Sequence, residues 1–377
     1  MRKICYVTGT RADFGLIRRT LHAIDDTQEF ELSIVATGMH LEEKYGFTIN
    51  EIEQFGFNIA ARIYNKRTDL SNGATMAHNL GKMICEMTDA FERISPDLIL
   101  LLGDRGEMLA GAIAALHLNI PIAHIHGGER SGTIDESIRH AISKIAHYHF
   151  VSTIESRERL IRMGEIPDRV FVVGAPGLDG IIDDANVKRE TLVSNFKLNE
   201  KSKLALFVFH PVVQEAGFAG KEAQTILDCL LEHNLQIIAL KPNSDAGSTS
   251  VCAVLEQYSA HSDIRVITHL KRDVYLSLLA IADMLVGNSS SGIIEAASFG
   301  TPVLNVGTRQ NLRERNKNVT DITADKNTLH NAIKTILEKG RYPVDNLYGN
   351  GDAGPRMVSL LKKIPLSAAI LSKVNAY

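Results

Sequence analysis

The residues best suited to chemistry lie in one stretch of the N-terminal half. Gly103-Asp104-Arg105 ends an apolar run, and a second apolar run ends in residues 124–129, which read His-Ile-His-Gly-Gly-Glu. Residues 132–140, Gly-Thr-Ile-Asp-Glu-Ser-Ile-Arg-His, follow closely. Packing alone does not require so many acids and histidines beside glycines. We interpret this stretch as an active site that moves protons.

The apolar runs before these residues predict the strands that position them. Strands in this half are expected at residues 4–7, 32–36, 98–102, 120–125 and 170–173, and helices between them at residues 14–24, 74–94 and 108–118. Strand and helix patterns that alternate in this way predict a parallel, doubly wound sheet. Ligands bind at the carboxyl edge of such sheets, where Asp104, His126 and Glu129 are expected.

A second series follows a domain boundary that we expect at residues 174–177. Its strands are predicted at residues 204–209, 236–240, 264–267, 284–286 and 303–305, with helices at residues 223–232 and 274–281. We therefore predict the α/β class, with two Rossmann-like, doubly wound domains that face a cleft, residues 1–176 and residues 177–355. The tail, residues 356–377, is apolar at helical spacing and is expected to pack back on the first domain.

Composition limits the class of protein. The length of 377 residues suits two domains, and 45% hydrophobic with 23% charged residues is typical of a soluble globular enzyme. A net charge of −3 predicts no attraction to nucleic acid, and no apolar run approaches the roughly 20 residues that span a bilayer. The chain enters a strand by Ile4 without an apolar leader, so we expect a cytoplasmic protein. The scattered cysteines predict reduced thiols, neither disulfides nor a zinc site: Cys5, Cys85, Cys229 and Cys252.

The turn after the first strand is a candidate phosphate site. Residues 9–15 read Gly-Thr-Arg-Ala-Asp-Phe-Gly and open a helix. Free amide groups there, together with Arg11, suit a phosphate, and the alternative is an ordinary strand–helix turn. The glycines do not make the dinucleotide fingerprint, and no acid follows the second strand at residues 36–38. We expect no nicotinamide and no other cofactor.

The second domain carries a hydroxyl-rich strand end. Residues 287–295 read Gly-Asn-Ser-Ser-Ser-Gly-Ile-Ile-Glu. Hydroxyl groups at a helix N-terminus can bind a diphosphate, and the Glu295 carboxylate can accept hydrogen bonds from the diol of a ribose. The alternative is an ordinary helix N-cap in a serine-rich loop that binds no ligand. Neither a Walker loop nor a nucleophile elbow occurs. Polar groups also follow three other predicted strands of this domain, at residues 210–211, 241–243 and 307–310. Together with residues 287–295, four strand ends carry polar groups, which predicts that a ligand binds at this edge of the sheet.

Two pairs of histidines suggest a metal site. His124 and His126, like His147 and His149, are two residues apart and would share one face of a strand, with Asp104 as a further ligand. A buried histidine satisfied by a neighbouring carboxylate is the more common arrangement. We therefore expect no metal.

Taken together, these segments resemble a known family. The whole chain resembles the hydrolysing UDP-N-acetylglucosamine 2-epimerases of bacterial sialic acid synthesis. The resemblance implies the two-domain glycosyltransferase-B architecture, in agreement with the strand and helix pattern. The matching segments occur in the same order over nearly the full length, at residues 9–13, 37–40, 103–105, 127–140, 209–211, 242–243 with Asp245, 287–292 with Glu295, and 307–310.

The resemblance also implies roles for individual residues. Arg11 and Arg105 of the first domain would face the diphosphate, and Asp104 and Asp135 would act on the sugar. Many members of the family have glutamate in place of His126, and the proton-transfer role of that glutamate is expected to pass to His126 or to Glu129. The residues implied to contact UDP from the second domain are His210, Asn243, Ser289, Ser290, Glu295 and Arg309.

The reaction that the resemblance implies converts UDP-N-acetylglucosamine and water to N-acetylmannosamine and UDP, for sialic acid synthesis. Elimination removes the C2 proton and UDP to leave a glycal; water then adds at C1, and C2 is reprotonated from the opposite face. This chemistry needs no cofactor. The expected partner is the nucleotide sugar alone, and a homodimer or homotetramer is expected by analogy.

Four alternatives remain open at the level of sequence. The same reaction on UDP-2,4-diacetamido-2,4,6-trideoxyglucose, for legionaminic acid, differs only at C4 and C6 of the sugar, away from the diphosphate motifs. A non-hydrolysing epimerase would retain UDP, but residues 127–135 resemble the hydrolysing branch. A glycosyltransferase of the same fold would need an acceptor, and a nucleotide-sugar sensor would not need the acids and histidines.

Overall fold

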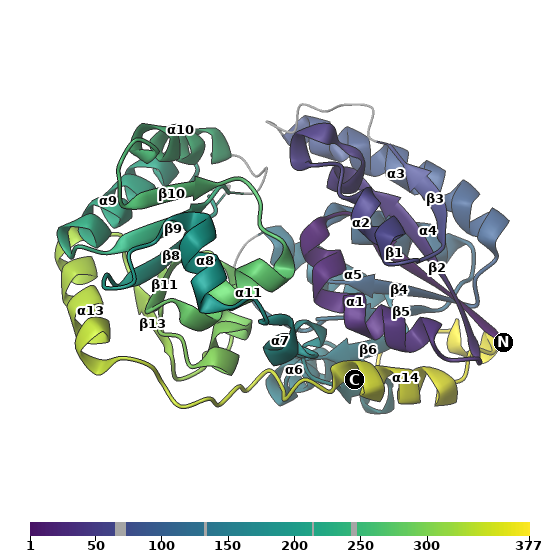
Figure 1. Ribbon diagram of the computed structural model, residues 1–377. Coiled ribbons are helices and arrows are strands. Elements are labelled where there is room, and N and C mark those ends of the chain that lie inside the picture. Colours follow the sequence, from purple (N-terminus) through teal and green to yellow (C-terminus); the bar gives the residue numbers. More distant parts are fainter. Residues whose placement is uncertain (65–72, 132–133, 213–214, 243–246) are drawn as a thin grey trace. The chain divides into compact units, whose positions relative to one another are not determined.

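A computed structural model describes residues 1–64, 73–131, 134–212, 215–242 and 247–377. The chain forms two compact units (Figure 1). The first comprises residues 1–130, 134–179 and 348–377, and the second is built on residues 180–347. The chain passes between the units at 179/180 and 347/348, compared with the predicted boundaries at 176/177 and 355/356.

The first unit contains a sheet of seven parallel strands in the order β3-β2-β1-β4-β5-β6-β7. The chain order reverses between β1 and β4, which is the switch point where ligands bind in such sheets. The strands are β1 Arg2–Thr8, β2 Phe30–Thr37, β3 Ile59–Ile63, β4 Leu98–Leu102, β5 Ile122–Ile125, β6 Tyr148–Val151 and β7 Val170–Val172.

Helices cover both faces of this sheet (Figure 1). Strand side chains alternate between the faces, so Ile4 and Tyr6 of β1 join one core while Cys5 and Val7 join the other. Helices α1 and α14 pack in the first of these cores, and α3, α4 and α5 pack in the second. The helices are α1 Arg11–Asp25, α2 Ile49–Gln54, α3 Gly73–Ile94, α4 Gly106–His117, α5 Ile134–Ile145, α6 Ile154–Arg162 and α14 Ala353–Lys363.

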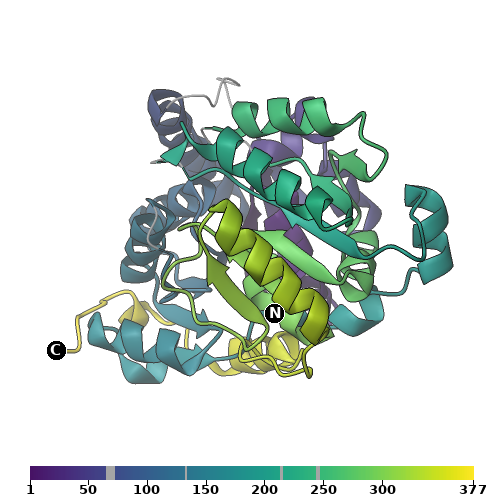
Figure 2. The same ribbon diagram turned by 90° about the vertical axis from the view of Figure 1, so that its left-hand side faces the viewer.

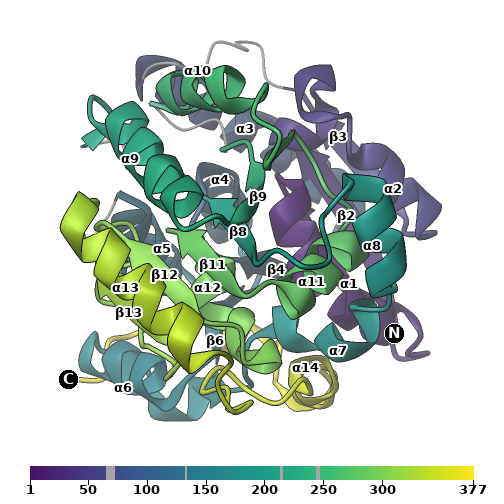
Figure 3. The same cartoon turned by 60° about the vertical axis from the view of Figure 1, so that its left-hand side comes forward.

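The second unit contains a sheet of six parallel strands in the order β10-β9-β8-β11-β12-β13, with its switch point between β8 and β11. Helices α9 and α13 cover one face, toward the viewer in Figure 3, and α8 and α11 pack on the other. The strands are β8 Leu204–Val208, β9 Gln236–Leu240, β10 Ile264–Ile267, β11 Met284–Gly287, β12 Val303–Val306 and β13 Val319–Ile322. The helices are α7 Ile181–Asp184, α8 Arg189–Phe196, α9 Ala219–Glu232, α10 Ser248–Tyr258, α11 Arg272–Ile281, α12 Ser290–Ile294 and α13 Lys326–Lys339.

The prediction of two Rossmann-like, doubly wound α/β domains is confirmed. In the view of Figure 2, α13 lies across the second sheet as the yellow-green helix. Among the helices of the described residues, none is both long and apolar enough to span a membrane.

The end of the chain is anchored to the first unit. Helix α14 ends at Lys363, two residues before Pro365, whose carbonyl accepts a hydrogen bond from the Tyr148 hydroxyl at 2.6 Å. Further on, the Lys373 ammonium donates to three backbone carbonyls at the end of α5, those of residues 143, 144 and 146. A cation at this position also stabilises the negative end of the helix dipole.

Three buried histidines are neutral in the folded protein. Burial lowers the pKa of His124 to about 3 and the pKa values of His40 and His147 to about 4, from an ordinary 6.5. Burial has the opposite effect on a carboxyl group, and it raises the pKa of Asp13 to about 6 from an ordinary 3.8.

Stability is therefore expected to fall as the pH drops from 6.5 towards 4. In this range the unfolded chain binds protons at these histidines and at His149, whose pKa burial also lowers, whereas Asp13 binds a proton in the folded state only. More protons bind to the unfolded chain than to the folded protein, so the free energy of unfolding decreases as the pH falls, which urea unfolding across this range measures.

A matched variant tests the origin of this pH dependence. His147 accepts a hydrogen bond from the Ile122 amide at Nδ1, 3.1 Å away. His147→Asn keeps an acceptor for that amide but cannot titrate, so it should reduce the slope by about 1.4 kcal/mol per pH unit. Stability that is constant or rises as the pH falls would contradict this account.

Candidate active site

The turn after β1 is closed by Asp13. Thr10 and Asp13 form a capping box at the start of α1, and the Asp13 carboxylate accepts the amides of Gly9 at 3.1 Å and Thr10 at 2.9 Å. Two of the amides that were expected to be free for a phosphate, those of Gly9 and Thr10, are therefore used by the helix cap. Arg11, the residue of this turn that was predicted to face the diphosphate, has its Nε 2.9 Å from Oε2 of Glu51 in α2.

A buried glutamate that the sequence did not reveal lies against this turn. Glu107, in the first turn of α4, is 8% exposed. A Cβ atom on Gly9 would lie 2.7 Å from its Cγ, and one on Gly38 would lie 2.8 Å from its Oε1, so both positions need glycine. The predicted diphosphate residue Arg105 lies beside it, with Nε 3.5 Å from Oε2 of Glu107.

Arg139 contacts two of the acidic residues that were predicted to be catalytic, Asp104 and Glu129. Its guanidinium, 1% exposed, forms an ion pair with Asp104 after β4 and donates from NH1 to the carbonyl of Glu129 at 2.9 Å. Burial disfavours the charge of Arg139, but Asp104, Glu129 and then Asp135 outweigh it and raise its pKa. Arg139 was not among the predicted site residues, although its i, i+4 spacing from Asp135 on α5 was a signal.

His126 forms a buried dyad with Glu129. Its Nδ1 lies 2.6 Å from Oε1 of Glu129, and the Ser152 hydroxyl lies 2.8 Å from the same nitrogen and donates to the same carboxylate oxygen at 3.0 Å. His126 has a φ of +63°, a left-handed conformation that is uncommon for residues other than glycine. Such conformations cost of order 1 kcal/mol and cluster at functional sites.

His124 has a structural role in this part of the site. Its Nε2 donates to the carbonyl of Gly103 at 2.7 Å and its Nδ1 accepts from the Ser143 hydroxyl at 3.1 Å, as the neutral imidazole requires. It thereby joins the loop that carries Asp104 to α5. The described residues include no group of three or more histidines, cysteines and acids arranged for a metal ion.

The loop after β11 organises the predicted UDP site of the second unit. A side chain on Gly287, whose φ is +138°, would collide with the carbonyl of Val208. The next residue, Asn288, exchanges two side-chain hydrogen bonds with the backbone of His210, at 2.7 and 2.8 Å. Arg309 donates to the Asn288 carbonyl at 3.1 Å. Three of the strand ends predicted to bind UDP therefore meet at Asn288, which the sequence did not single out.

The serines and Glu295 also have partners within this unit. The Ser289 hydroxyl caps α12 by accepting the amide of Ser291, and α12 begins at Ser290 but has only five residues, so its dipole is small. Arg272 donates to Glu295 at 2.7 Å, and Glu295 is 3% exposed. The ribose contact expected of Glu295 would therefore involve a carboxylate that an arginine already holds. Asn243, the remaining predicted contact, lies outside the described residues.

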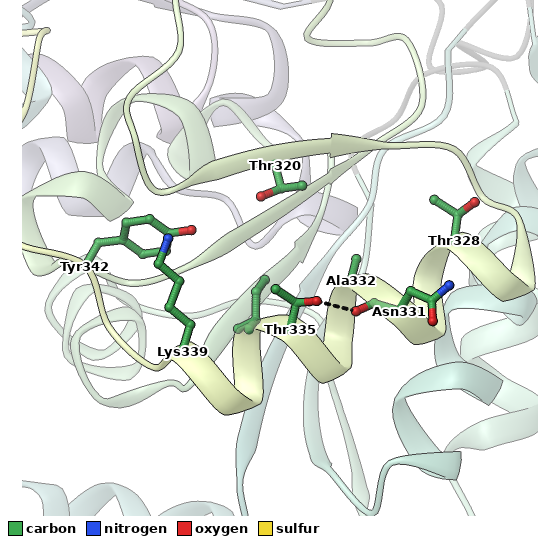
Figure 4. A pocket seen from close by; sticks show the side chains of 8 residues that line it. Thr320, Thr328, Asn331, Ala332, Thr335, Lys339 and Tyr342 are labelled. Atoms are coloured by element: carbon green, nitrogen blue, oxygen red, sulfur yellow. Dashed lines mark hydrogen bonds between the residues drawn. The ribbon is translucent and has the colours of Figure 1, made fainter.

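A cavity of about 380 Å³ lies between β13 and α13, away from every predicted site residue (Figure 4). The hydroxyls of Thr328 and Thr335 in its wall donate to Asp325 and to the carbonyl of Asn331. The lining includes no acid and no histidine, so this cavity adds no candidate acid–base group.

Two doubly wound parallel sheets, each with polar groups after the carboxyl ends of its strands, place the chain in the glycosyltransferase-B fold class. The chain belongs to the UDP-N-acetylglucosamine 2-epimerase family, whose family model matches residues 22–362.

Relatives with established names have nearly the same length. A UDP-N,N'-diacetylbacillosamine 2-epimerase (hydrolyzing) of Legionella pneumophila is 48% identical over 100% of both chains. A GDP/UDP-N,N'-diacetylbacillosamine 2-epimerase (hydrolyzing) of Campylobacter jejuni is 35% identical over 90% of this chain and 88% of the relative. A UDP-N-acetylglucosamine 2-epimerase of Neisseria meningitidis is 33% identical over 93% and 92%. These relatives support hydrolysing 2-epimerisation of a nucleotide sugar as the class of reaction.

Solved structures share the fold. The structure of a UDP-GlcNAc 2-epimerase from Neisseria meningitidis bound to UDP-GlcNAc matches with a TM-score of 0.82 at 19% identity, over 96% of this chain and 100% of the other. A Methanocaldococcus jannaschii UDP-GlcNAc 2-epimerase in complex with UDP-GlcNAc and UDP matches with a TM-score of 0.77 at 21% identity, over 96% and 99%.

Proposed function

We propose that this protein is a hydrolysing 2-epimerase of UDP-2,4-diacetamido-2,4,6-trideoxyglucose, which is UDP-N,N'-diacetylbacillosamine. The products are UDP and the free diacetamido sugar with inverted C2. The observation that carries this proposal is the 48% identity to the Legionella pneumophila enzyme over the whole of both chains. The resemblance in the sequence alone points to UDP-N-acetylglucosamine. That sugar is the second candidate, because the Neisseria meningitidis relative named for it is 33% identical.

In the first unit, we assign proton transfer to the groups around Arg139. Inversion at C2 needs a proton acceptor on one face of the ring and a donor on the other. Groups from three different loops can flank a sugar in this way, and each positioned acid or base typically contributes about 10²–10⁴-fold. The catalytic set proposed is Asp104, His126, Glu129 and Asp135.

In the same proposal, the nucleotide is held by basic and hydroxyl groups. The diphosphate gains charge as the C1–O bond breaks, and fixed cations and hydrogen-bond donors stabilise that charge. We assign this role to Arg11, Arg105 and Arg309, and contacts to UDP to His210, Asn243, Ser289, Ser290 and Glu295. The reaction uses no cofactor, and we propose a cytoplasmic homodimer or homotetramer.

Proton NMR in D₂O tests the proposal with both nucleotide sugars. We expect release of UDP together with a free sugar that carries deuterium at C2, and a higher kcat/KM for the diacetamido sugar. A higher kcat/KM for UDP-N-acetylglucosamine would reverse the order of the two substrates. Formation of the UDP-linked 2-epimer without release of UDP would identify a non-hydrolysing enzyme and contradict the proposal.

A further inference from the structure

We propose that Nε2 of His126 takes the C2 proton of the sugar, and that Glu129 and Ser152 are positioning residues that hold the imidazole for this step. The assignment rests on the proposed function and divides the roles among its acids. It makes an imidazole, in place of a carboxylate, the base of the elimination.

The hydrogen bonds at Nδ1 decide which nitrogen is basic. A carboxylate oxygen can only accept, so the 2.6 Å contact between Nδ1 of His126 and Oε1 of Glu129 requires the proton on Nδ1. Both hydrogen bonds of the His126 ring to described residues involve Nδ1. The neutral ring therefore keeps its lone pair on Nε2. A carboxylate behind a histidine fixes the tautomer in this way and stabilises the imidazolium that forms.

Ser152 restricts Glu129 to this supporting role. Its hydroxyl donates to the same Oε1 atom at 3.0 Å, and Glu129 is 4% exposed. The backbone of Glu129 is fixed as well, because Arg139 donates to its carbonyl at 2.9 Å. Two contacts on one carboxylate oxygen fix the position of the Glu129 side chain, which suits a group that stabilises a cation and does not itself move to the sugar.

Asp104 is a weaker candidate for the same proton. Its carboxylate forms an ion pair with Arg139, whose guanidinium is 1% exposed, and an opposite charge at such close range favours the ionised carboxylate. His126 sits at the carboxyl end of β5 and has no cation in hydrogen-bond contact among the described residues.

The step balances without a further reactant. Nε2 of His126 takes the proton from C2, the electrons of the C2–H bond form the C1=C2 double bond, and the electrons of the C1–O bond leave with UDP. The dyad then carries a positive imidazolium beside the negative Glu129. Another acid then reprotonates C2 on the opposite face, the hydroxyl group of the added water bonds to C1, and the proton of that water restores the acid. The imidazolium of His126 returns its proton to the released UDP or to solvent.

Chemical rescue tests the assignment. We expect His126→Ala to lower kcat by about 10³-fold, to retain UDP binding by calorimetry, and to regain activity when imidazole is added, since free imidazole replaces the missing base. Glu129→Gln should lower kcat by about 10²-fold or more and Ser152→Ala by less, both without rescue by imidazole.

A second measurement is the primary isotope effect on kcat with the sugar deuterated at C2, which should increase in His126→Ala. His117→Ala, an exposed histidine on α4, is the control and should match the unaltered protein.

Two results would overturn the assignment. One is a kcat of His126→Ala close to that of the unaltered protein, and the other is a loss that imidazole does not restore although UDP still binds. Absence of UDP release from either sugar by the unaltered protein is a different outcome, because it overturns the proposed function itself.

Discussion

Asp104→Asn is expected to abolish turnover while UDP still binds. Asparagine keeps the size of the side chain but removes the charge that Asp104 presents to Arg139 and, in the proposed function, to the sugar. Loss of a positioned acid–base group typically costs about 10²–10⁴-fold in rate. UDP release measures turnover, and calorimetric titration with UDP measures binding.

The environment of Arg139 requires a folding control for this variant. The guanidinium is buried, so removal of one carboxylate leaves a charge that the Glu129 carbonyl and Asp135 compensate only in part. We therefore expect some loss of stability, which UDP binding and thermal unfolding will show separately from turnover. Asp168→Asn, on an exposed residue, is the matched control and should leave activity unchanged. Activity of Asp104→Asn within a few-fold of the unaltered protein would refute the role.

The strands that carry the site were predictable because they are apolar throughout. β4 and β8 are buried on both faces, and short apolar runs bounded by glycine or polar residues predict such strands. β6, with the sequence Tyr-His-Phe-Val, is equally buried but contains His149, whose Nε2 lies 2.9 Å from Oε2 of Glu165. That contact depends on tertiary structure, so the strand was not predicted. β3 and β13 are partly exposed edge strands with a weaker pattern.

The sequence indicated where the site lies better than how its groups interact. Acids and histidines at the strand ends were visible as motifs, but the ion pair between Asp104 and Arg139 joins residues on different elements. The same is true of Ser152, which follows β6 and reaches Glu129 after β5. The use of the Gly9 amide by Asp13 was predictable, since a threonine followed three residues later by an acid is a capping signature.

Glu165 offers the largest expected effect on stability. Its carboxylate is 2% exposed and accepts from His149 at 2.9 Å, Lys144 at 2.7 Å and Lys373 at 2.6 Å. Burial alone would raise the pKa of Glu165, but the hydrogen bonds from His149 and the two lysines outweigh it and hold the pKa at about 2. Lys373 also donates to the carbonyls that end α5, the helix that carries Asp135. The cluster therefore joins the end of the chain to a helix of the proposed site.

Glu165→Gln is expected to lower the free energy of unfolding by up to about 3 kcal/mol near neutral pH, because it leaves the partly buried Lys144 and Lys373 without their buried negative partner. Urea unfolding measures this loss. The folded-state pKa of about 2 lies below the ordinary 4.5, so the contribution of Glu165 is full above pH 4.5 and disappears as the pH falls through 2. The difference between the variant and the unaltered protein should shrink over that range. Asp345→Asn, which breaks an exposed pair with Lys317, should leave the free energy of unfolding nearly unchanged. A loss as small as this in Glu165→Gln, or one independent of pH, would show that the cluster does not hold the chain end through its charge.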